Sequence, residues 1–292
     1  MGVDEPVFYP PESIEAVREG RGFDASVGGV WCVGTIESLR RPTVAVVGTR
    51  APSPLGRGLA RDFARDLGAA GCTIVSGLAL GIDACAHEGA LEAGAPTIGI
   101  LGGGHRHFFP PRNRELAERM VAGGGAVLSP FDPSRDVRPY QFLHRNVFVA
   151  RLSDAVVVIE APARSGAINT AGWASGYVPT FAVPGDVDRP QVAGCLALIR
   201  EGSILARNAA DVLEALRVQV PLPGFEAVPA PADPIDRRVL EAIGERTQSL
   251  DELALVTALS IAPLLVALTS LELRGYIEAR GPGTYARKLR PS

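Results

Sequence analysis

Short apolar runs that end in glycine or at a turn recur along most of this sequence, and they constrain its fold more than any other feature. The runs are continuously apolar and rich in β-branched residues, which is typical of strands buried on both faces. The predicted strands are Val30–Gly34, Val44–Gly48, Thr73–Gly77, Thr97–Gly102, Ala126–Ser129, Ala155–Glu160 and Thr180–Gly185. Helical patterns separate them, as in Gly58–Ala70, Asp83–Ala93 and Arg112–Ala122.

Regular alternation of strands and helices over residues 30–218 predicts an α/β fold with an open, doubly wound and mostly parallel sheet. In such sheets ligands bind outside the carboxyl ends of the strands, so the loops at those ends are the first place to search for a site. Residues 1–29 are polar and show little periodicity, and we expect them to form a short N-terminal appendage.

A second, smaller domain is predicted at the C-terminus. Residues 219–234 contain five prolines and read as a semi-extended linker. In residues 235–292, helices are expected at Ile235–Ile243, after a Ser249 N-cap with Glu252 three residues on, and at Ala262–Arg274. A hairpin follows, and three helices with a hairpin predict a winged helix. The third helix has one basic residue, Arg274, so a protein contact or a lid is favoured over duplex reading.

Composition narrows the class of protein. The net charge of −3 gives no global attraction to nucleic acid or membrane, so a polyanion site has to be a local patch. Lys288 is the one lysine, so the cations available to the main domain are arginines. The four cysteines form no CxxC pair and read as buried, reduced residues. We see no signal peptide and no membrane span, so the cytoplasm is the expected location.

The first chemical motif is VAVVGTRAPSPLG, in which a predicted strand ends at Gly48 and a helix starts near Ser53 or Gly56. A glycine turn that leads into a helix presents backbone N–H groups to an anion, and Thr49 and Arg50 lie on that turn. The spacing matches neither a GxGxxG fingerprint nor a P-loop. The alternative is that glycine only bends an ordinary βα turn.

The second motif is IVSGLALGIDACAH, which repeats the arrangement of a strand running into a glycine turn. Ser76 and Gly77 end the strand, Gly81 follows, and the Ser76 hydroxyl is a candidate phosphate ligand. For Asp83 we favour a cap of the following helix over a ligand contact. His87 is expected to bond the end of a neighbouring strand.

Two further loops carry polar side chains at predicted strand ends. In GGGHRHFFPPRNR, basic residues lie on both sides of Phe108 and Phe109, and Arg112 and Asn113 follow them, a pattern suited to single-stranded nucleic acid. His105 and His107 lack a third ligand, so we expect no metal site. The other loops contain Arg145 with Asn146, and Ser165 with Gly166 before a helix. Glu160, at a strand end, is expected to organise arginines and not to act as a base.

Together these motifs resemble the DprA/Smf family of DNA-processing proteins over roughly residues 30–290. The resemblance rests on several stretches in the family's order, and they are VAVVGTR, SGLALGID, the GGG…P-x-x-N loop, FLHRN, SDAVVVIEA, SGAINTA, FAVPGD and LIREGS, followed by the linker and winged helix. It implies an extended Rossmann fold and assigns Gly48, Thr49 and Arg50 to the family's phosphate-binding G-S-R loop.

The resemblance also implies a function. Family members bind and protect single-stranded DNA, help load the recombinase RecA in natural transformation, form homodimers, and are neither enzymes nor cofactor-dependent. The expected DNA-binding residues are Gly48, Thr49, Arg50, Ser76, Gly77, Gly81, Asp83, Arg112, Asn113, Arg145, Asn146, Ser165 and Gly166.

The sequence departs from the family pattern at several pocket positions. Leu80 and Val147 stand where arginines are usual, Pro130 replaces a glutamate, and Phe109 replaces a tyrosine. Arg50 is therefore expected to carry a larger share of phosphate binding. The alternative function is a nucleotide-ligand sensor, or a phosphoribohydrolase of the related lysine-decarboxylase-like group. Residues 163–171 (ARSGAINTA) lack the catalytic glutamate of that group, which argues against the enzyme.

Overall fold

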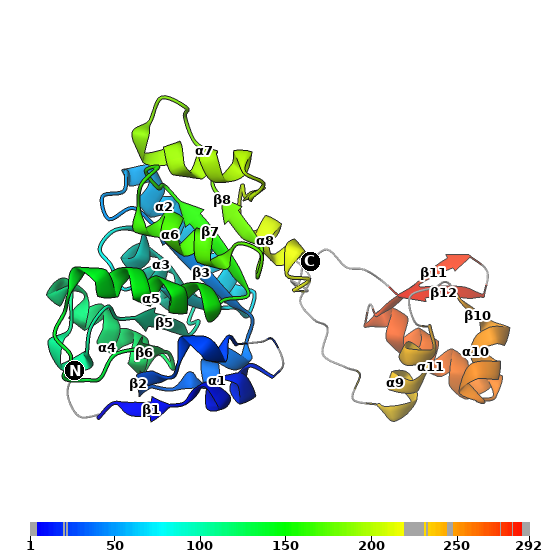
Figure 1. Cartoon of the computed structure of the whole chain (residues 1–292). Helices are drawn as coiled ribbons and strands as arrows, with labels where there is room; N and C mark the ends of the chain where they lie inside the picture. The colour runs from blue at the N-terminus through cyan, green and yellow to red at the C-terminus, as the bar shows by residue number, and fades with distance from the viewer. Residues whose placement is uncertain are drawn as a thin grey trace. The chain divides into compact units, whose positions relative to one another are not determined.

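A computed structural model of the chain describes residues 5–19, 21, 23–218, 231, 233–243, 248–274, 276–281 and 283–287 (Figure 1). The chain forms two compact units, Met1–Gln219 and Val220–Ser292, each of which is described by itself. Most of the predicted linker, residues 219–234, lies outside the described residues.

In the described part of the first unit, nine strands form one sheet in the order β1-β2-β6-β5-β4-β3-β7-β8-β9. In this spatial order the seven strands β6-β5-β4-β3-β7-β8-β9 are all parallel to their neighbours. At one edge, β2 pairs antiparallel with β6, and β1 pairs antiparallel with β2. The mostly parallel sheet predicted from the sequence is therefore confirmed. The strands are β1 Val7–Tyr9, β2 Val30–Gly34, β3 Thr43–Gly48, β4 Thr73–Ser76, β5 Thr97–Ile100, β6 Ala126–Ser129, β7 Ala155–Ile159, β8 Thr180–Ala182 and β9 Ile204–Leu205.

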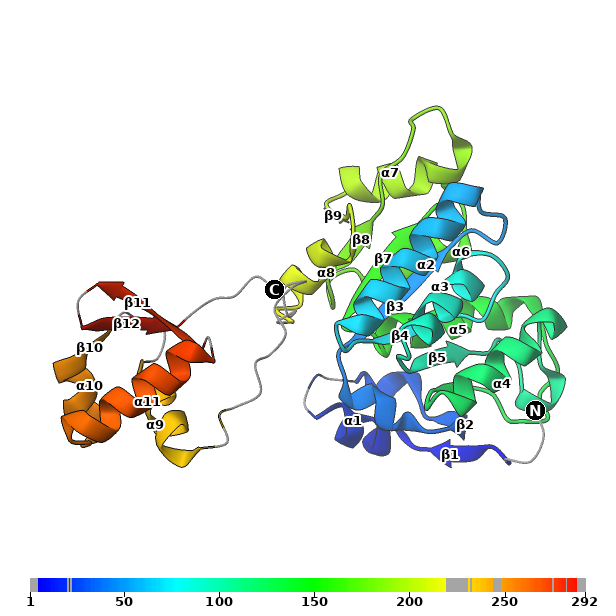
Figure 2. The same ribbon diagram turned by 180° about the vertical axis from the view of Figure 1, so that it is seen from behind.

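Helices cover both faces of this sheet, as a doubly wound fold requires. Figure 1 shows α5 and α6 on one face, and Figure 2 shows α2, α3 and α4 on the other. The α-helices of this unit are α1 Pro11–Arg18, α2 Pro54–Ala69, α3 Ile82–Glu92, α4 Arg114–Ala122, α5 Pro139–Arg151, α6 Gly166–Ala174, α7 Ala193–Arg200 and α8 Ala209–Ala215. Short 3-10 turns are η1 Ala25–Val27, η2 Ile36–Arg40, η3 His105–His107, η4 Pro111–Asn113 and η5 Pro190–Val192.

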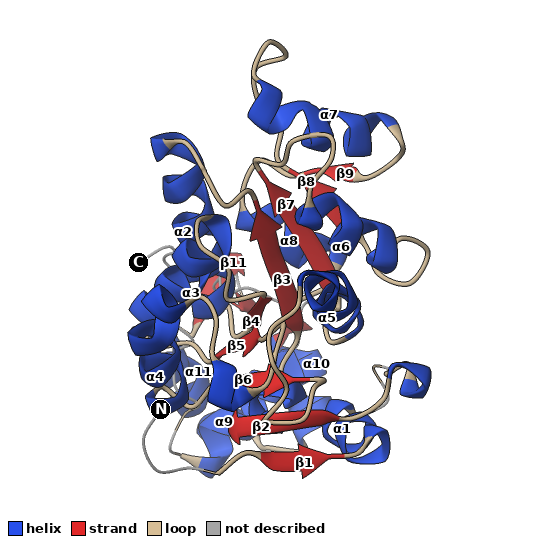
Figure 3. Cartoon of the chain, turned by 60° about the vertical axis from the view of Figure 1, so that its left-hand side comes forward, coloured by secondary structure: helices blue, strands red, loops and turns tan. Residues whose placement is uncertain are grey.

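The central strands are continuously apolar because each of their faces contributes to a separate core. In β3, Val44 and Val46 pack with residues of α2 and α3, whereas Ala45 and Val47 pack with residues of α5 and α6. Successive side chains of a strand point to opposite faces, so a strand covered on both sides has to be apolar at every position. The layers are seen edge-on in Figure 3.

The described residues of the segment 1–29 contribute to the main sheet and its core. β1 pairs with β2, and Ile14 and Val17 of α1 are buried in the core beneath α5. The Arg18 guanidinium is also buried. It donates to the Leu152 carbonyl at 2.7 Å and to an Asp154 carboxylate oxygen at 2.7 Å. These contacts join α1 to the segment just before β7, at the amino ends of the central strands.

The second unit has the elements of a winged helix. They are α9 Pro234–Ile243, β10 Gln248–Ser249, α10 Leu250–Thr257, α11 Ile261–Leu273, β11 Ile277–Gly281 and β12 Thr284–Arg287. The predicted capping box is confirmed, because the Ser249 hydroxyl accepts from the Glu252 amide and the Glu252 carboxylate accepts from the Ser249 amide. In the described residues no single helix is long and apolar enough to cross a membrane, and the pair α10 and α11, bent by 110°, passes that test only jointly.

Candidate nucleic-acid interface

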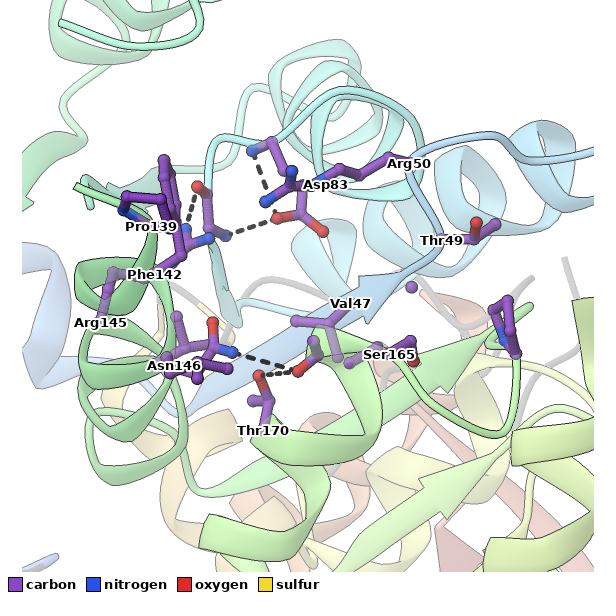
Figure 4. A pocket seen from close by; sticks show the side chains of 18 of the residues that line it. Val47, Thr49, Arg50, Asp83, Pro139, Phe142, Arg145, Asn146, Ser165 and Thr170 are labelled. Carbon is purple, nitrogen blue, oxygen red and sulfur yellow. Dashed lines mark hydrogen bonds between the residues drawn. The ribbon is translucent and has the colours of Figure 1, made fainter. Parts of the chain in front are cut away.

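A pocket of about 640 Å³ lies in the first unit, at the carboxyl ends of β3, β4 and β7. The chain leaves β3 toward β4 on one side of the sheet, while β7 pairs with β3 on the other side. Loops from both halves of the fold therefore meet at this point (Figure 4). The pocket is lined by Val47, Gly48, Thr49, Arg50, Gly77, Ala79, Asp83, Phe109, Pro139, Phe142, Leu143, Arg145, Asn146, Val149, Pro162, Ser165, Gly166, Ala167 and Thr170.

The turn after β3 forms one wall, as predicted. Gly48 is required there, because a Cβ atom would collide with the Ile159 carbonyl oxygen and the Ile82 side chain. The Thr49 amide donates to the Glu160 carbonyl at 2.7 Å, and the Ala51 amide donates to the Thr49 hydroxyl at 3.2 Å. Arg50 is exposed, and its guanidinium carbon lies 5.4 Å from the centre of the Phe142 ring.

Glu160 holds this turn from the neighbouring strand. Its carboxylate accepts from the Ser53 amide at 2.8 Å and the Ser53 hydroxyl at 2.5 Å, and from Arg189 at 2.9 Å. Ser53 in turn caps α2 by accepting from the Gly56 amide at 3.0 Å. Burial raises the pKa of Glu160, but the bonds from Ser53 and Arg189 outweigh it, so its pKa lies below the ordinary value. The predicted organising role fits these contacts.

The second turn is built differently from the prediction in two places. Ser76 is fully buried and its hydroxyl donates to the Val46 carbonyl at 2.7 Å, so it does not line the pocket. The predicted helix cap at Asp83 is wrong, because Gly81 occupies the N-cap position of α3. The Asp83 carboxylate instead accepts from the amides of Gly77 at 3.1 Å and Ala79 at 3.3 Å. It therefore fixes the loop between β4 and α3.

Gly81 joins the two turns sterically. Its φ of +86° belongs to a region that other residues rarely adopt, and an added Cβ would lie 2.5 Å from the Thr49 carbonyl oxygen. The Ile82 amide donates to that same oxygen at 3.1 Å. The Thr49 turn thus rests directly on the start of α3.

Arg145 lines the pocket, but its guanidinium already has partners inside the protein. Nη1 donates to the carbonyls of Gly77 and Ile100, the latter at 2.7 Å, whereas Nε has no hydrogen-bond partner among the described residues. Burial lowers the pKa of Arg145 to about 10, despite the opposing charge of Asp83. Burial likewise raises the pKa of Asp83, against the nearby Arg145 and Arg50. Arg145 therefore ties the ends of β4 and β5 together.

The remaining predicted residues divide into two groups. Asn113 is buried and its amide donates to the carbonyls of Leu78 at 2.8 Å and Ala79 at 3.1 Å, so it supports the second turn from behind. Arg112 is exposed and is not among the described residues that line the pocket.

Asn146, Ser165 and Gly166 come together on the opposite wall. The Asn146 amide donates to the Gly166 carbonyl and to the Asn169 side-chain oxygen, both at 3.2 Å. Ser165 caps α6 by accepting from the Ile168 amide at 3.4 Å. The first turn of α6 therefore points its N-terminal end into the pocket.

Sequence reasoning pointed to the aromatic residues before Asn113 but missed the part of the apolar rim that α5 supplies. Phe142 and Leu143 of α5 lie at the rim together with Phe109, which precedes the buried Asn113 loop. The signal for Phe142 was present in FLHRN, because residues three and four apart on a helix share a face and Arg145 and Asn146 are in the pocket. Within the described residues, no group of three or more His, Cys, Asp or Glu side chains is arranged to hold a metal ion.

The fold and pocket define a Rossmann-type protein with a glycine turn and an exposed arginine beside an aromatic rim, joined to a winged helix. The chain belongs to the DNA recombination-mediator protein A family, whose model matches residues 21–217. The model of the DprA winged helix domain matches residues 223–283.

Similar proteins agree with this assignment. Protein Smf of Synechocystis is 34% identical over 281 residues, covering 85% of this chain and 70% of the relative. A putative DNA processing protein DprA of Mycobacterium tuberculosis is 36% identical, covering 86% of this chain and 66% of the relative. The solved DprA of Streptococcus pneumoniae has a TM-score of 0.62 at 35% identity, covering 68% of this chain and 69% of that one.

A second solved structure concerns single-stranded DNA directly. The DNA processing protein A of Helicobacter pylori, described for its single-stranded DNA binding mode, has a TM-score of 0.62 at 29% identity. The match covers 72% of this chain and 95% of that protein.

Proposed function

We propose that the chain binds single-stranded DNA at this pocket. The observation that carries the proposal is the exposed guanidinium of Arg50 on a glycine turn, within reach of the aromatic rim formed by Phe109 and Phe142. Phosphates suit the guanidinium and the N-terminal end of α6, and unpaired bases suit the rings. The Helicobacter pylori relative, which is described as binding single-stranded DNA, supports this assignment.

The two arginines of the pocket are given different roles. Arg50 contacts the phosphate, because its guanidinium is exposed at the mouth. Arg145 acts through the protein, because its guanidinium already bonds two backbone carbonyls and holds the Gly77 loop. Arg112 lies outside the pocket, and we keep it as a predicted contact to a second phosphate of the bound DNA strand.

Replacing Arg50 tests this function. Arg50→Ala should weaken binding of oligo-dT about 10- to 150-fold, the equivalent of a lost charged hydrogen bond of about 1.5–3 kcal/mol. The slope of log K against log salt should fall by about 0.7 for each phosphate released. Arg65→Ala, an exposed arginine of α2 paired with Asp62 and Asp66, is the control and should leave both unchanged. Unaltered affinity of Arg50→Ala would refute the site.

The competing nucleotide-sensor hypothesis uses the same cavity, whose volume of about 640 Å³ would also admit a mononucleotide. Titration with oligo-dT and with free dTMP separates the two hypotheses. A single-strand-binding protein should bind the oligonucleotide more tightly, whereas a nucleotide sensor should bind the mononucleotide more tightly. An enzymatic role is not favoured: among the described residues that line the pocket Asp83 is the one carboxylate, and its oxygen is bonded to two amides.

A role in recombination extends the proposal. Following the family, we infer that the chain protects incoming single strands, helps RecA load onto them during transformation and acts as a homodimer. Faster RecA filament formation on coated single strands in the presence of the chain is the expected result. Light scattering should report twice the monomer mass, and a monomer that still stimulates RecA would contradict the dimer.

For the winged helix we propose a protein contact in place of duplex reading. Val266 and Leu273 on α11 are 71% and 81% exposed, and the described side chains of α11 include no base. DNA grooves select basic and amide side chains on such a helix. A chain shortened to residues 1–218 should therefore keep its affinity for oligo-dT within a few-fold, and complete loss of binding would overturn this assignment.

A further inference from the structure

An exposed tryptophan lies just beyond the pocket on α6. Trp173 is 43% exposed, although tryptophan is a large apolar side chain. It follows Thr170, a residue of the pocket wall, by three positions on the same helix. Residues three and four apart on a helix are neighbours on its surface, and the axial rise between them is about 4.5 Å. The distance along α6 from the pocket wall at Thr170 to Trp173 is therefore comparable to the spacing between successive nucleotides of a single strand.

Contacts between α5 and α6 define the surface that continues from the pocket. Near the pocket, the Asn146 amide of α5 donates to the Asn169 side chain of α6. Further along both segments, the Arg151 guanidinium carbon lies 3.2 Å from the centre of the Tyr177 ring, which is 69% exposed. Figures 1 and 3 show the two helices side by side. We call this surface, from Asn169 through Trp173 to Tyr177, the α5–α6 seam.

The seam has aromatic surface and little free charge. Arg151 is the cation of the seam, and its Nε lies 3.7 Å from the Asp24 carboxylate, which offsets its charge. Val147, on α5 between Asn146 and Arg151, is half-buried and packs on the core. An aromatic surface of this kind recognises flat apolar rings in preference to phosphates, because stacking needs a ring face and not a charge.

We propose that Trp173 and Tyr177 form a stacking track for the bases of a single strand that extends beyond the pocket along the α5–α6 seam. The proposal rests on the proposed function, since the pocket supplies the phosphate contact that brings the strand to the seam. It adds binding residues that make the interaction depend on strand length. The contribution of the track is stacking, so it is nearly independent of salt, unlike that of Arg50.

The first test compares strand length and salt in the full chain. Trp173→Ala should weaken binding of a long oligo-dT about 5-fold or more at every salt concentration, with no change of salt slope. It should leave the weaker binding of the mononucleotide dTMP, which reaches only the pocket, unaffected. Trp173→Phe should retain most of the wild-type affinity for the long oligo-dT, because phenylalanine also offers a ring face. Phe8→Ala, an exposed aromatic on β1, is the matched control and should bind as the wild type does.

The outcomes separate the track from the pocket. If Arg50→Ala weakens binding and Trp173→Ala does not, the track is wrong and the pocket stands. If neither the wild type nor any variant binds oligo-dT, the proposed function itself fails. A changed salt slope in Trp173→Ala would also overturn the track, because it would show loss of a phosphate contact.

Fluorescence provides a second, direct readout. The sequence contains two tryptophans, Trp31 and Trp173. In Trp31→Phe the remaining emission comes from Trp173, and a base stacked on that ring should quench it when long oligo-dT is added. In Trp173→Phe, where Trp31 remains, no quenching is expected. Unquenched emission in Trp31→Phe at saturating oligo-dT would refute the proposal.

Discussion

The contact between Gly81 and the Thr49–Arg50 turn leads to the sharpest prediction of the structure. Replacing Gly81 with alanine forces a side chain into a rarely populated backbone conformation, φ +86° and ψ −126°, which costs other residues about 1–3 kcal/mol. The new Cβ would also lie 2.5 Å from the Thr49 carbonyl oxygen, where ordinary contact begins at 3.4 Å. The Thr49–Arg50 turn must therefore move by about 1 Å, because the packed interior yields little.

Both stability and binding should respond. Strain and collision together should lower the free energy of unfolding by about 2–6 kcal/mol. Displacement of Arg50 should weaken oligo-dT binding about 10- to 150-fold, as loss of a charged hydrogen bond does. Urea unfolding followed by tryptophan fluorescence reports the first quantity, since Trp31 and Trp173 both belong to the first unit. Fluorescence anisotropy of labelled oligo-dT reports the second.

A matched glycine separates backbone strain from the collision. Gly71 has a φ of +91° and no atom within 4 Å of an added Cβ. Gly71→Ala should lose about 1–3 kcal/mol of stability from its positive φ and bind oligo-dT normally. If Gly81→Ala bound as tightly as Gly71→Ala, the idea that Gly81 shapes the phosphate turn would be refuted.

Two further predictions concern stability. Asp154→Ala removes a carboxylate that accepts from Arg18, Arg21 and Thr43, and it should lower the free energy of unfolding by about 3–5 kcal/mol. The control Glu19→Ala, which removes an exposed partner of Arg40, should lower it by less than about 1 kcal/mol in the same urea assay. Burial lowers the pKa of His87 to about 3, so the unfolded chain binds the extra proton and stability falls as pH drops below about 6.5, by at most about 1.4 kcal/mol per pH unit. His87→Gln should flatten the dependence between pH 6 and 5, and an unchanged slope would contradict the assignment.

The sheet and the position of the turn after β3 were predictable because their signals are local. A continuously apolar run such as Val44–Gly48 requires cover on both faces, and its glycine end marks the βα turn. The Ser53 cap of α2 follows from residue type and position alone. His87 also met its prediction, since its Nδ1 lies 2.7 Å from the hydroxyl of Thr97 at the start of β5.

The errors concern side chains whose direction depends on tertiary packing. Ser76 ends a strand, but whether its hydroxyl faces the pocket or the adjacent strand depends on the pleat at that point. Asp83 has the sequence position of a cap, yet Gly81 starts the helix and turns the carboxylate back onto the loop. Phe142 was missed because α5 reaches the pocket only after the chain has crossed the sheet.

The contacts of Glu160 determine which positions of the turn from Thr49 to Ser53 tolerate substitution. Its carbonyl fixes the start of the turn at Thr49, and its carboxylate fixes the end at Ser53. The shape of the turn is therefore set by one residue, Glu160, immediately after β7, while the exposed Ala51 lies between the two anchored positions and, in the described part of the chain, makes no contact to Glu160 that fixes the turn. Under the proposed function, a reporter group introduced at Ala51 would lie beside the bound strand without altering the anchors at Thr49 and Ser53, so the labelled protein would report the binding of single-stranded DNA.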